Sequence, residues 1–188
     1  MVQPGAPGQS SRVVSAANTA KGGALPYTAA DVKFMQGMIG HHAQALEMTA
    51  LLHERSANPD MKLLARRIEV SQLDEIKMMK DWLTSRGQAL PDEHAHHAGD
   101  HALMPGMLTQ AQMQQLAAAK GVEFDRLFLQ GMIRHHGGAL TMVQELFSKP
   151  GAGQDAEIFA FASDVDADQR MEMDRMAAML AMLKEQER

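Results

Sequence analysis

The sequence predicts an all-α protein, a four-helix bundle built from two repeated helical hairpins with a long central connection. Three observations predict it. The segment FMQGMIGHHAQALEM at 34–48 returns as FLQGMIRHHGGALTM at 128–142, with ten of fifteen positions identical. A partner segment, QLDEIKMMKDWL at 72–83, aligns with QRMEMDRMAAML at 169–180. Apolar residues recur at helical spacing and no strand pattern occurs, so two related hairpins packed about an approximate two-fold axis are the simplest arrangement.

The first predicted elements follow from composition and capping signals. Residues 1–27, rich in Gly, Ala, Ser and Pro, are predicted to be a disordered leader or linker. One bundle then covers 28–188. Thr28 is expected to cap a helix that runs to about residue 52, and Asn58 followed by Pro59 is expected to begin a second helix. This hairpin, ending near residue 87, is repeat one.

The remaining elements form the connection and the second hairpin. The connection, 88–120, is rich in His and Met and carries a short predicted helix at 110–119, capped by Thr109. Repeat two, 121–188, is predicted to hold helices at about 122–147 and 155–185.

Composition excludes several classes of function. The chain has 188 residues and a net charge of −5 with His neutral, without the basic surface that nucleic-acid binding requires. No apolar run is long enough to cross a membrane. Cysteine is absent, which excludes thiolate metal sites, whereas seventeen Met and nine His supply many thioether and imidazole donors.

The repeat places histidines among core residues. Steps of four and three residues from Phe34 keep to one helical stripe, which passes through Met38, His41 and Met48. The second copy has Met132, His135 and Met142 at the same places, and the adjacent His42 and His136 flank the same core. The histidines are therefore expected inside the bundle.

The facing helices carry complementary polar residues on their apolar stripes. Gln72 and Glu75 interrupt one stripe, and Gln169 and Glu172 interrupt the other. Buried polar groups need partners, and the histidines of the adjacent helices are the expected ones. If the histidines bind a metal, these four residues would surround the ligands and fix the imidazole tautomers.

Three interpretations of this layer stay open. It could be a structural polar layer without any ligand, which would make the protein an interaction module. It could be a carboxylate-bridged di-metal oxidase using Glu75 and Glu172, although the di-iron Glu-x-x-His pattern is replaced by Met38 before His41 and Met132 before His135. We favour the third, a copper-binding protein that catalyses no reaction, because thioether and imidazole select copper and especially Cu(I).

The connection is a second candidate site. Pro105 and Gly106 impose a turn between Met104 and Met107 that could bring the two sulfurs together. Four histidines precede this turn and could capture Cu(II) or zinc, or form only a solvated loop of weak affinity. They are His94, His96, His97 and His101.

These motifs resemble a bacterial family of secreted or membrane-anchored, His- and Met-rich bundles, the CopM-like family. The resemblance rests on F-x-x-x-M-I-x-H-H-x-x-A-x-x-M, present twice, and on MPGMLT, FDRLFLQGMI and Q-x-x-E-[IM], and it covers about 28–184. It implies a ferritin-like four-helix bundle in the periplasm or outside the cell, which binds copper for sequestration, resistance or trafficking. Metal ions and other copper-handling proteins would be its partners. The matching positions are Met38, His41, His42, Met48, Met104, Met107, Met132, His135, His136 and Met142.

Overall fold

The computed structural model describes residues 2–3, 12–13, 27–91 and 103–186 of the chain. Its helices are α2 (Ala29–Arg55), α3 (Pro59–Ser85), α4 (Gln110–Ala118), α5 (Gly121–Ser148) and α6 (Ala156–Gln186). The predicted all-α bundle is confirmed, and the helices begin and end within a few residues of their predicted limits. Near the N-terminus, β1 (Val2–Gln3) and β2 (Arg12–Val13) pair antiparallel, a contact that no sequence pattern predicted.

The predicted capping residues begin their helices. The Thr28 hydroxyl accepts from the backbone N–H of Asp31, whose carboxylate accepts from the N–H of Thr28. Thr109 and Gln112 form the same reciprocal box at α4. Asn58 accepts from the N–H of Asp60, with proline at the first helical position of α3. These local bonds satisfy backbone donors that a helix leaves free at its start.

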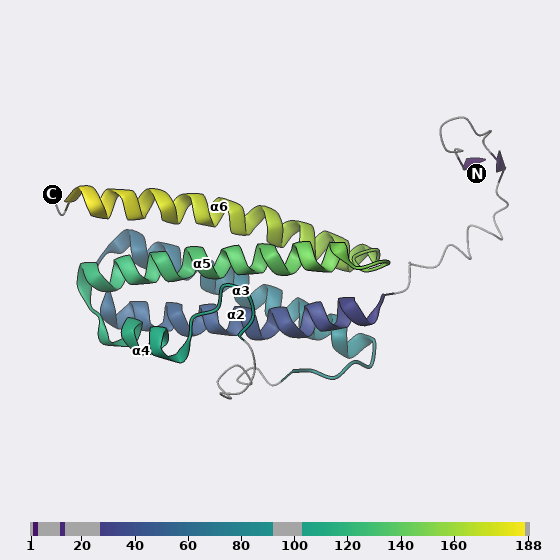
Figure 1. Ribbon diagram of the computed structural model, residues 1–188, viewed down its shortest axis with the longest axis horizontal. Helices are drawn as coiled ribbons and strands as arrows, with labels where there is room; N and C mark the ends of the chain where they lie inside the picture. The colour runs from purple at the N-terminus through teal and green to yellow at the C-terminus, as the bar shows by residue number, and fades with distance from the viewer. Residues whose placement is uncertain (1, 4–11, 14–26, 92–102, 187–188) are drawn as a thin grey trace.

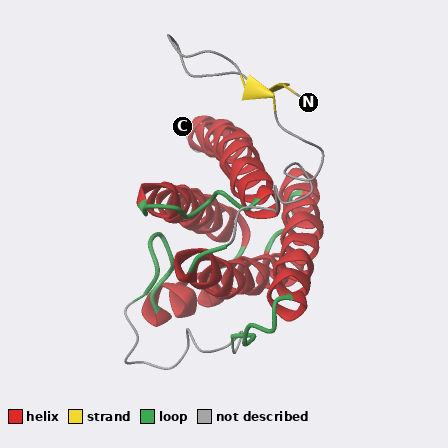
Figure 2. Ribbon diagram, turned by 90° about the vertical axis from the view of Figure 1, so that its right-hand side faces the viewer, coloured by secondary structure: helices red, strands yellow, loops and turns green. Residues whose placement is uncertain are grey.

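Four long helices form the bundle, as the view along their axes shows (Figure 2). Helix α2 packs against α3 and α5 packs against α6, so that each repeat is a hairpin (Figure 1). The contact between α2 and α5 joins the two hairpins. Within the part of the chain that the structure describes, no helix is long and apolar enough to cross a membrane.

The buried apolar residues form two clusters rather than one. Along α2, the first cluster ends at Ile39 and the second begins at Ala45. Along α5, the order is reversed, and the clusters meet between Met132 and Ala139. Both intervals contain the paired histidines, so a polar layer divides the core at mid-height.

Two repeated glycines let α2 and α5 approach closely. A Cβ on Gly37 would lie 3.4 Å from the methyl of Met142, and a Cβ on Gly131 would lie 3.2 Å from the methyl of Met48. Met48 and Met142 are themselves equivalent in the repeat, so each helix receives the methionine of the other at the same place. Close contact of the helices therefore accounts for both glycines.

Each hairpin also locks the turn of the other. The buried carboxylate of Asp31 accepts from the backbone N–H of Gly153, in the turn between α5 and α6, at 2.7 Å. Its repeat equivalent, Asp125, is also buried, and its carboxylate interacts with Ser56 in the turn between α2 and α3. These paired contacts hold the two hairpins in one register.

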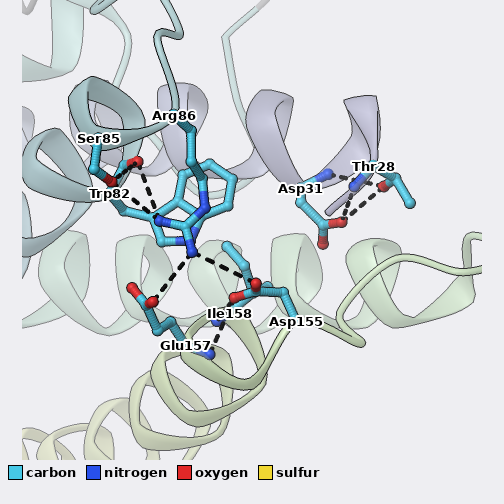
Figure 3. A network of polar contacts seen from close by, with 8 residues as sticks. All are labelled: Thr28, Asp31, Trp82, Ser85, Arg86, Asp155, Glu157 and Ile158. Atoms are coloured by element: carbon cyan, nitrogen blue, oxygen red, sulfur yellow. Dashed lines mark hydrogen bonds and ion pairs between the residues drawn. The ribbon is translucent and has the colours of Figure 1, made fainter. Parts of the chain in front are cut away.

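Arg86 fastens the end of α3 to the start of α6 (Figure 3). Its guanidinium lies over the Trp82 ring, 4.4 Å from the centroid, and pairs with Glu157 at 3.1 Å and Asp155 at 3.5 Å. Asp155 in turn accepts from the N–H groups of Glu157 and Ile158 in the first turn of α6. The clasp therefore caps α6 and joins the outer helices.

Candidate metal centre

Four histidines from α2 and α5 form the polar layer between the apolar clusters. His41, His42 and His136 are fully buried and His135 is 1% exposed, as the repeat predicted. Four buried imidazoles would be unfavourable without polar partners. Each ring has one, and always at Nε2.

The outer rings are paired with glutamates, each within its own hairpin. The Nε2 of His42 lies 2.6 Å from the carboxylate of Glu75, and the Nε2 of His136 lies 2.6 Å from that of Glu172. The sequence predicted both partners. Both glutamates are partly exposed, at 18% and 21% of the side chain, so they connect the buried rings to the surface.

The inner rings are held by backbone carbonyls. His41 Nε2 donates to the carbonyl of Pro105 at 3.0 Å, and His135 Nε2 donates to the carbonyl of His41 at 2.9 Å. The two rings lie against each other in a tilted arrangement, with centroids 3.8 Å apart and planes inclined by 35°. The sequence did not predict either carbonyl, because a backbone acceptor leaves no residue-type signal.

In each of the four histidines, the ring nitrogen that this pattern does not use is Nδ1. Within the described chain, the Nδ1 atoms of His41, His42, His135 and His136 are buried and have no hydrogen-bond partner. In a neutral imidazole whose Nε2 carries the proton, Nδ1 has a lone pair. Histidines that ligate metals almost always donate their other ring N–H to a carboxylate or a backbone carbonyl, as all four do here. The donor set therefore fits a metal.

Electrostatics keep the inner rings neutral. Burial and, after it, the charge of His42 lower the pKa of His41 to about 3, against the opposing effect of the bond to Pro105. Burial and the charge of His41 hold the pKa of His135 well below its ordinary value. Burial raises the pKa of Glu75, but the hydrogen bonds from His42 and Ser71 and the charge of His42 together outweigh this, and the pKa lies below the ordinary value. At neutral pH, the inner rings are lone-pair donors.

The predicted methionines belong to the apolar clusters on the two sides of this layer, Met38 and Met142 to the first and Met48 and Met132 to the second. Met38, Met48 and Met132 are fully buried and Met142 is 9% exposed. The sulfur of Met104 would lie 3.4 Å from a Cβ on Gly37, beside the methyl of Met142. Met107 is buried. The structure thus brings Met104 to Met142 on α5.

A short segment, Met104–Leu108, covers the crossing of α2 and α5, and we call it the strap. It turns at Gly106, whose φ of 77° favours glycine, and the N–H of Met107 donates to the carbonyl of Met104 at 3.2 Å. Just before α4, it passes in front of the two helices (Figure 1). The strap supplies the carbonyl that His41 contacts.

Gln44 is a polar residue of the layer that sequence reasoning missed. It is buried, and its side-chain amide forms two hydrogen bonds with the backbone of Leu108 in the strap. Its repeat equivalent is Gly138, so Gln44 departs from the repeat at a core position. That departure is the signal that could have found it.

Two further sets of predicted residues are the glutamines of the facing helices and the histidines of the connection. Gln72 and Gln169 are buried, but their side-chain oxygens have no hydrogen-bond partner in the described chain, so their predicted contact with histidine is not seen. The predicted loop ligands lie outside the described residues; they are His94, His96, His97 and His101.

Carboxylates gather on the solvent side of the layer, between α3 and α6. A groove of about 380 Å³ there is lined by residues that include Ser71, Asp168 and Glu172. Burial raises the pKa of Asp168, and the charge of Glu75 raises it further. Neither the groove nor the histidine layer contains a complete set of metal ligands of these types: among the described residues, no three His, Cys, Asp or Glu side chains are arranged to hold one metal ion. A metal in the layer would therefore need thioether or backbone ligands beside imidazole.

Comparison with known proteins gives a family and several similar structures. A model of DUF305, a domain of unknown function, matches residues 31–180. A candidate secreted DUF305 protein from Streptomyces coelicolor is 26% identical, with a TM-score of 0.72 over 82% of this chain and 94% of that one. A DUF305 fragment from Deinococcus radiodurans is 32% identical, with a TM-score of 0.71 over 84% and 99%. CopM in its Cu(II)-bound form is 28% identical, with a TM-score of 0.64 over 80% and 95%.

Among curated proteins, an uncharacterized protein of Acanthamoeba polyphaga mimivirus is 38% identical over 56 residues. These residues are 30% of this chain, and they span only 37% of that relative's length. Together with the structural matches, the family model confirms the CopM-like assignment that the repeated motifs predicted.

Proposed function

This chain belongs to the DUF305 family, and we propose that it is a copper-binding protein that sequesters or carries copper outside the cytoplasm. The observation that carries the proposal is the set of four buried imidazoles, each with a hydrogen bond at Nε2 and no partner at Nδ1 among the described residues. Similarity to CopM, whose structure holds Cu(II), supports copper as the metal.

The ligand set supports copper over a hard cation. Imidazole and thioether are the donors that select copper, and Cu(I) in particular. One metal ion would be held by no more than two of the four histidines together with thioether sulfur, since no three His, Cys, Asp or Glu side chains of the described chain are arranged around one ion. Glu75 and Glu172 would orient two of the rings rather than bind metal themselves, because each already accepts a hydrogen bond from a histidine.

We propose binding rather than turnover. A di-iron oxidase requires several carboxylates around its metals, whereas each glutamate here reaches a single histidine within its own hairpin. Adding Fe(II) to the protein under air is therefore expected to give no oxygen consumption above that of free Fe(II). Catalytic consumption would support the oxidase instead.

Location outside the cytoplasm is part of the proposal. It is supported by the similarity to a candidate secreted protein of the same family. Fractionation of cells that express the native gene would test it, with a cytoplasmic enzyme as the marker.

A titration tests copper binding. Protein purified without an affinity tag should bind Cu(I) in competition with a Cu(I)-specific chelator, and excess zinc should not displace the copper. The variant His41→Ala/His135→Ala should lose this binding. His53→Ala is the matched control, because His53 is on α2 but is 54% exposed and pairs with Glu69 outside the layer. Equal affinity of the double variant and the control would refute a site in the layer.

A second variant separates the layer from the connection. Replacement of all four connection histidines by alanine should leave the tight Cu(I) site intact and remove only weaker Cu(II) or zinc binding. The four positions are His94, His96, His97 and His101. Complete loss of Cu(I) binding in this variant would move the site to the connection.

A further inference from the structure

Gln44, a buried residue of α2, forms two hydrogen bonds with the backbone of a single residue, Leu108. Its Nε2 donates to the carbonyl of Leu108 at 2.9 Å, and its Oε1 accepts from the N–H of Leu108 at 2.7 Å. Both bonds are buried, and the side chain is 3% exposed. A buried amide without hydrogen-bond partners is energetically costly, so both bonds favour this position of the chain. The strap is therefore fixed at Leu108.

The opposite side of the strap is fixed by the second helix. Gly138, the repeat equivalent of Gln44, leaves room for the strap: a Cβ there would lie 1.9 Å from the carbonyl oxygen of Pro105. Arg134 also donates to the carbonyl of Met107 at 3.3 Å. Gln44 thus binds the strap through its side chain, whereas Gly138, the equivalent residue of the second repeat, leaves room for the strap because it has no side chain.

The strap in turn sets the inner histidine of α2. The Pro105 carbonyl can only accept a hydrogen bond, so His41 Nε2 must carry the proton and the lone pair must be at Nδ1. His41 then presents its own backbone carbonyl to His135. A displaced strap would leave the His41 ring free to protonate either nitrogen.

We propose that Gln44 is a positioning residue for the metal layer: it holds the strap so that Pro105 keeps the proton of His41 on Nε2 and leaves Nδ1 for the metal. The expected effect of Gln44 on copper affinity rests on the proposed copper function, whereas its effect on the His41 tautomer does not. Loss of an outer partner of a metal-ligating histidine typically lowers metal affinity by about 10–100-fold. The Gln44→Leu variant should therefore bind Cu(I) at least about tenfold more weakly.

The first test reads the tautomer directly. Nitrogen-15 NMR of the imidazole in metal-free protein at neutral pH distinguishes a protonated Nε2 from a protonated Nδ1. Wild-type His41 should be protonated at Nε2 alone. The Gln44→Leu variant should show both tautomers in exchange. A wild-type ring protonated at Nδ1 overturns the proposal without any variant.

A matched control separates positioning from stability. Gln36 is also on α2 and its amide also donates to a backbone carbonyl, that of Ala89, at 2.8 Å, away from the strap. Gln36→Leu should keep the wild-type tautomer and copper affinity. If Gln44→Leu lowers only the melting temperature and leaves the His41 tautomer unchanged, Gln44 is a structural anchor and the proposal fails.

A second variant moves the strap without changing Gln44. Gly138→Ala places a methyl against Pro105 and should produce the same mixture of tautomers at His41. A folded Gly138→Ala protein with wild-type tautomer contradicts the proposal. Wild-type protein that binds no copper overturns the proposed function instead, and the tautomer, read without metal, still decides the role of Gln44.

Discussion

The rings of His41 and His135 are in contact between α2 and α5, tilted by 35° with centroids 3.8 Å apart. They are equivalent residues of the two repeats, and the ring pair lies where the two apolar clusters meet. Two positive charges at this separation would repel each other strongly in a buried site. The ring pair therefore requires neutral imidazoles, which is the state in which a metal can bind them.

Acid should destabilise the metal-free protein through these rings. Their pKa values are lowered in the folded state, that of His41 from 6.5 to about 3. As the pH falls below 6.5, the unfolded chain takes up protons that the folded protein excludes, so the free energy of unfolding should fall toward pH 3. Glu75, whose pKa is lowered, adds a loss of the same sign at the acid end.

Urea denaturation at several pH values measures this effect. Stability should decline more steeply with acid in wild type than in His41→Asn/His135→Asn, which lacks both rings. The exposed His53→Ala control should follow the wild-type profile. Parallel profiles for wild type and the double variant would show that the inner rings do not titrate as described.

Adjacent glycines of α5 should respond to alanine in opposite directions. A Cβ on Gly138 would lie 1.9 Å from the Pro105 carbonyl oxygen, so Gly138→Ala should destabilise the protein by about 1–3 kcal/mol. A Cβ on Gly137 would meet only the methyl of Met173, at 4.0 Å. Gly137→Ala should therefore stabilise the protein by up to about 1 kcal/mol through helix propensity. Chemical denaturation compares the two, and equal effects would mean that the strap does not press on α5.

The glutamates should tune copper affinity without binding copper. Glu75→Gln and Glu172→Gln remove the charge that each outer histidine contacts while keeping the side-chain shape. Each should weaken Cu(I) binding by roughly tenfold or more. Glu69→Gln is the matched control, since Glu69 pairs with the exposed His53 at 3.1 Å. Chelator competition measures all three, and an unchanged affinity in both test variants would remove the glutamates from the site.

Asp31, a buried polar residue at the start of α2, should be sensitive to substitution. Its carboxylate accepts from the backbone and hydroxyl of Thr28 and from the N–H of Gly153. Asp31→Ala should lower the free energy of unfolding by about 2–3 kcal/mol, because a cap and a buried charged bond are lost together. Asp81→Ala, at an exposed pair with Lys77, should change stability little. A small effect of Asp31→Ala would show that the bonds of Asp31 to Thr28 and Gly153 contribute little to stability.

Much of the fold could be predicted because its signals are local. Thr28, Asn58 and Thr109 each begin a helix through side chains within a few residues. The hairpin pairing followed from the repeat, which needs no knowledge of distant contacts. The clasp of Arg86 on Asp155 and Glu157 could not be predicted in this way, since it joins residues far apart in the chain that share no motif.

The site was predictable where side chains meet side chains. Buried His42 and His136 needed acidic partners, and the stripes of α3 and α6 offered Glu75 and Glu172. The inner rings use backbone carbonyls instead, which every residue possesses. Similarly, Gln72 and Gln169 occupy the predicted stripe, yet helical phase alone cannot fix where a flexible amide points.

Asp31 and Asp125 are equivalent residues of the two repeats, and each carboxylate interacts with the turn of the opposite hairpin. Because each hairpin supports the turn of the other, the two halves should unfold in one cooperative step rather than one after the other. The halves are nevertheless not interchangeable, since Gln44 binds the connecting segment through its side chain whereas Gly138 makes room for that segment by lacking one.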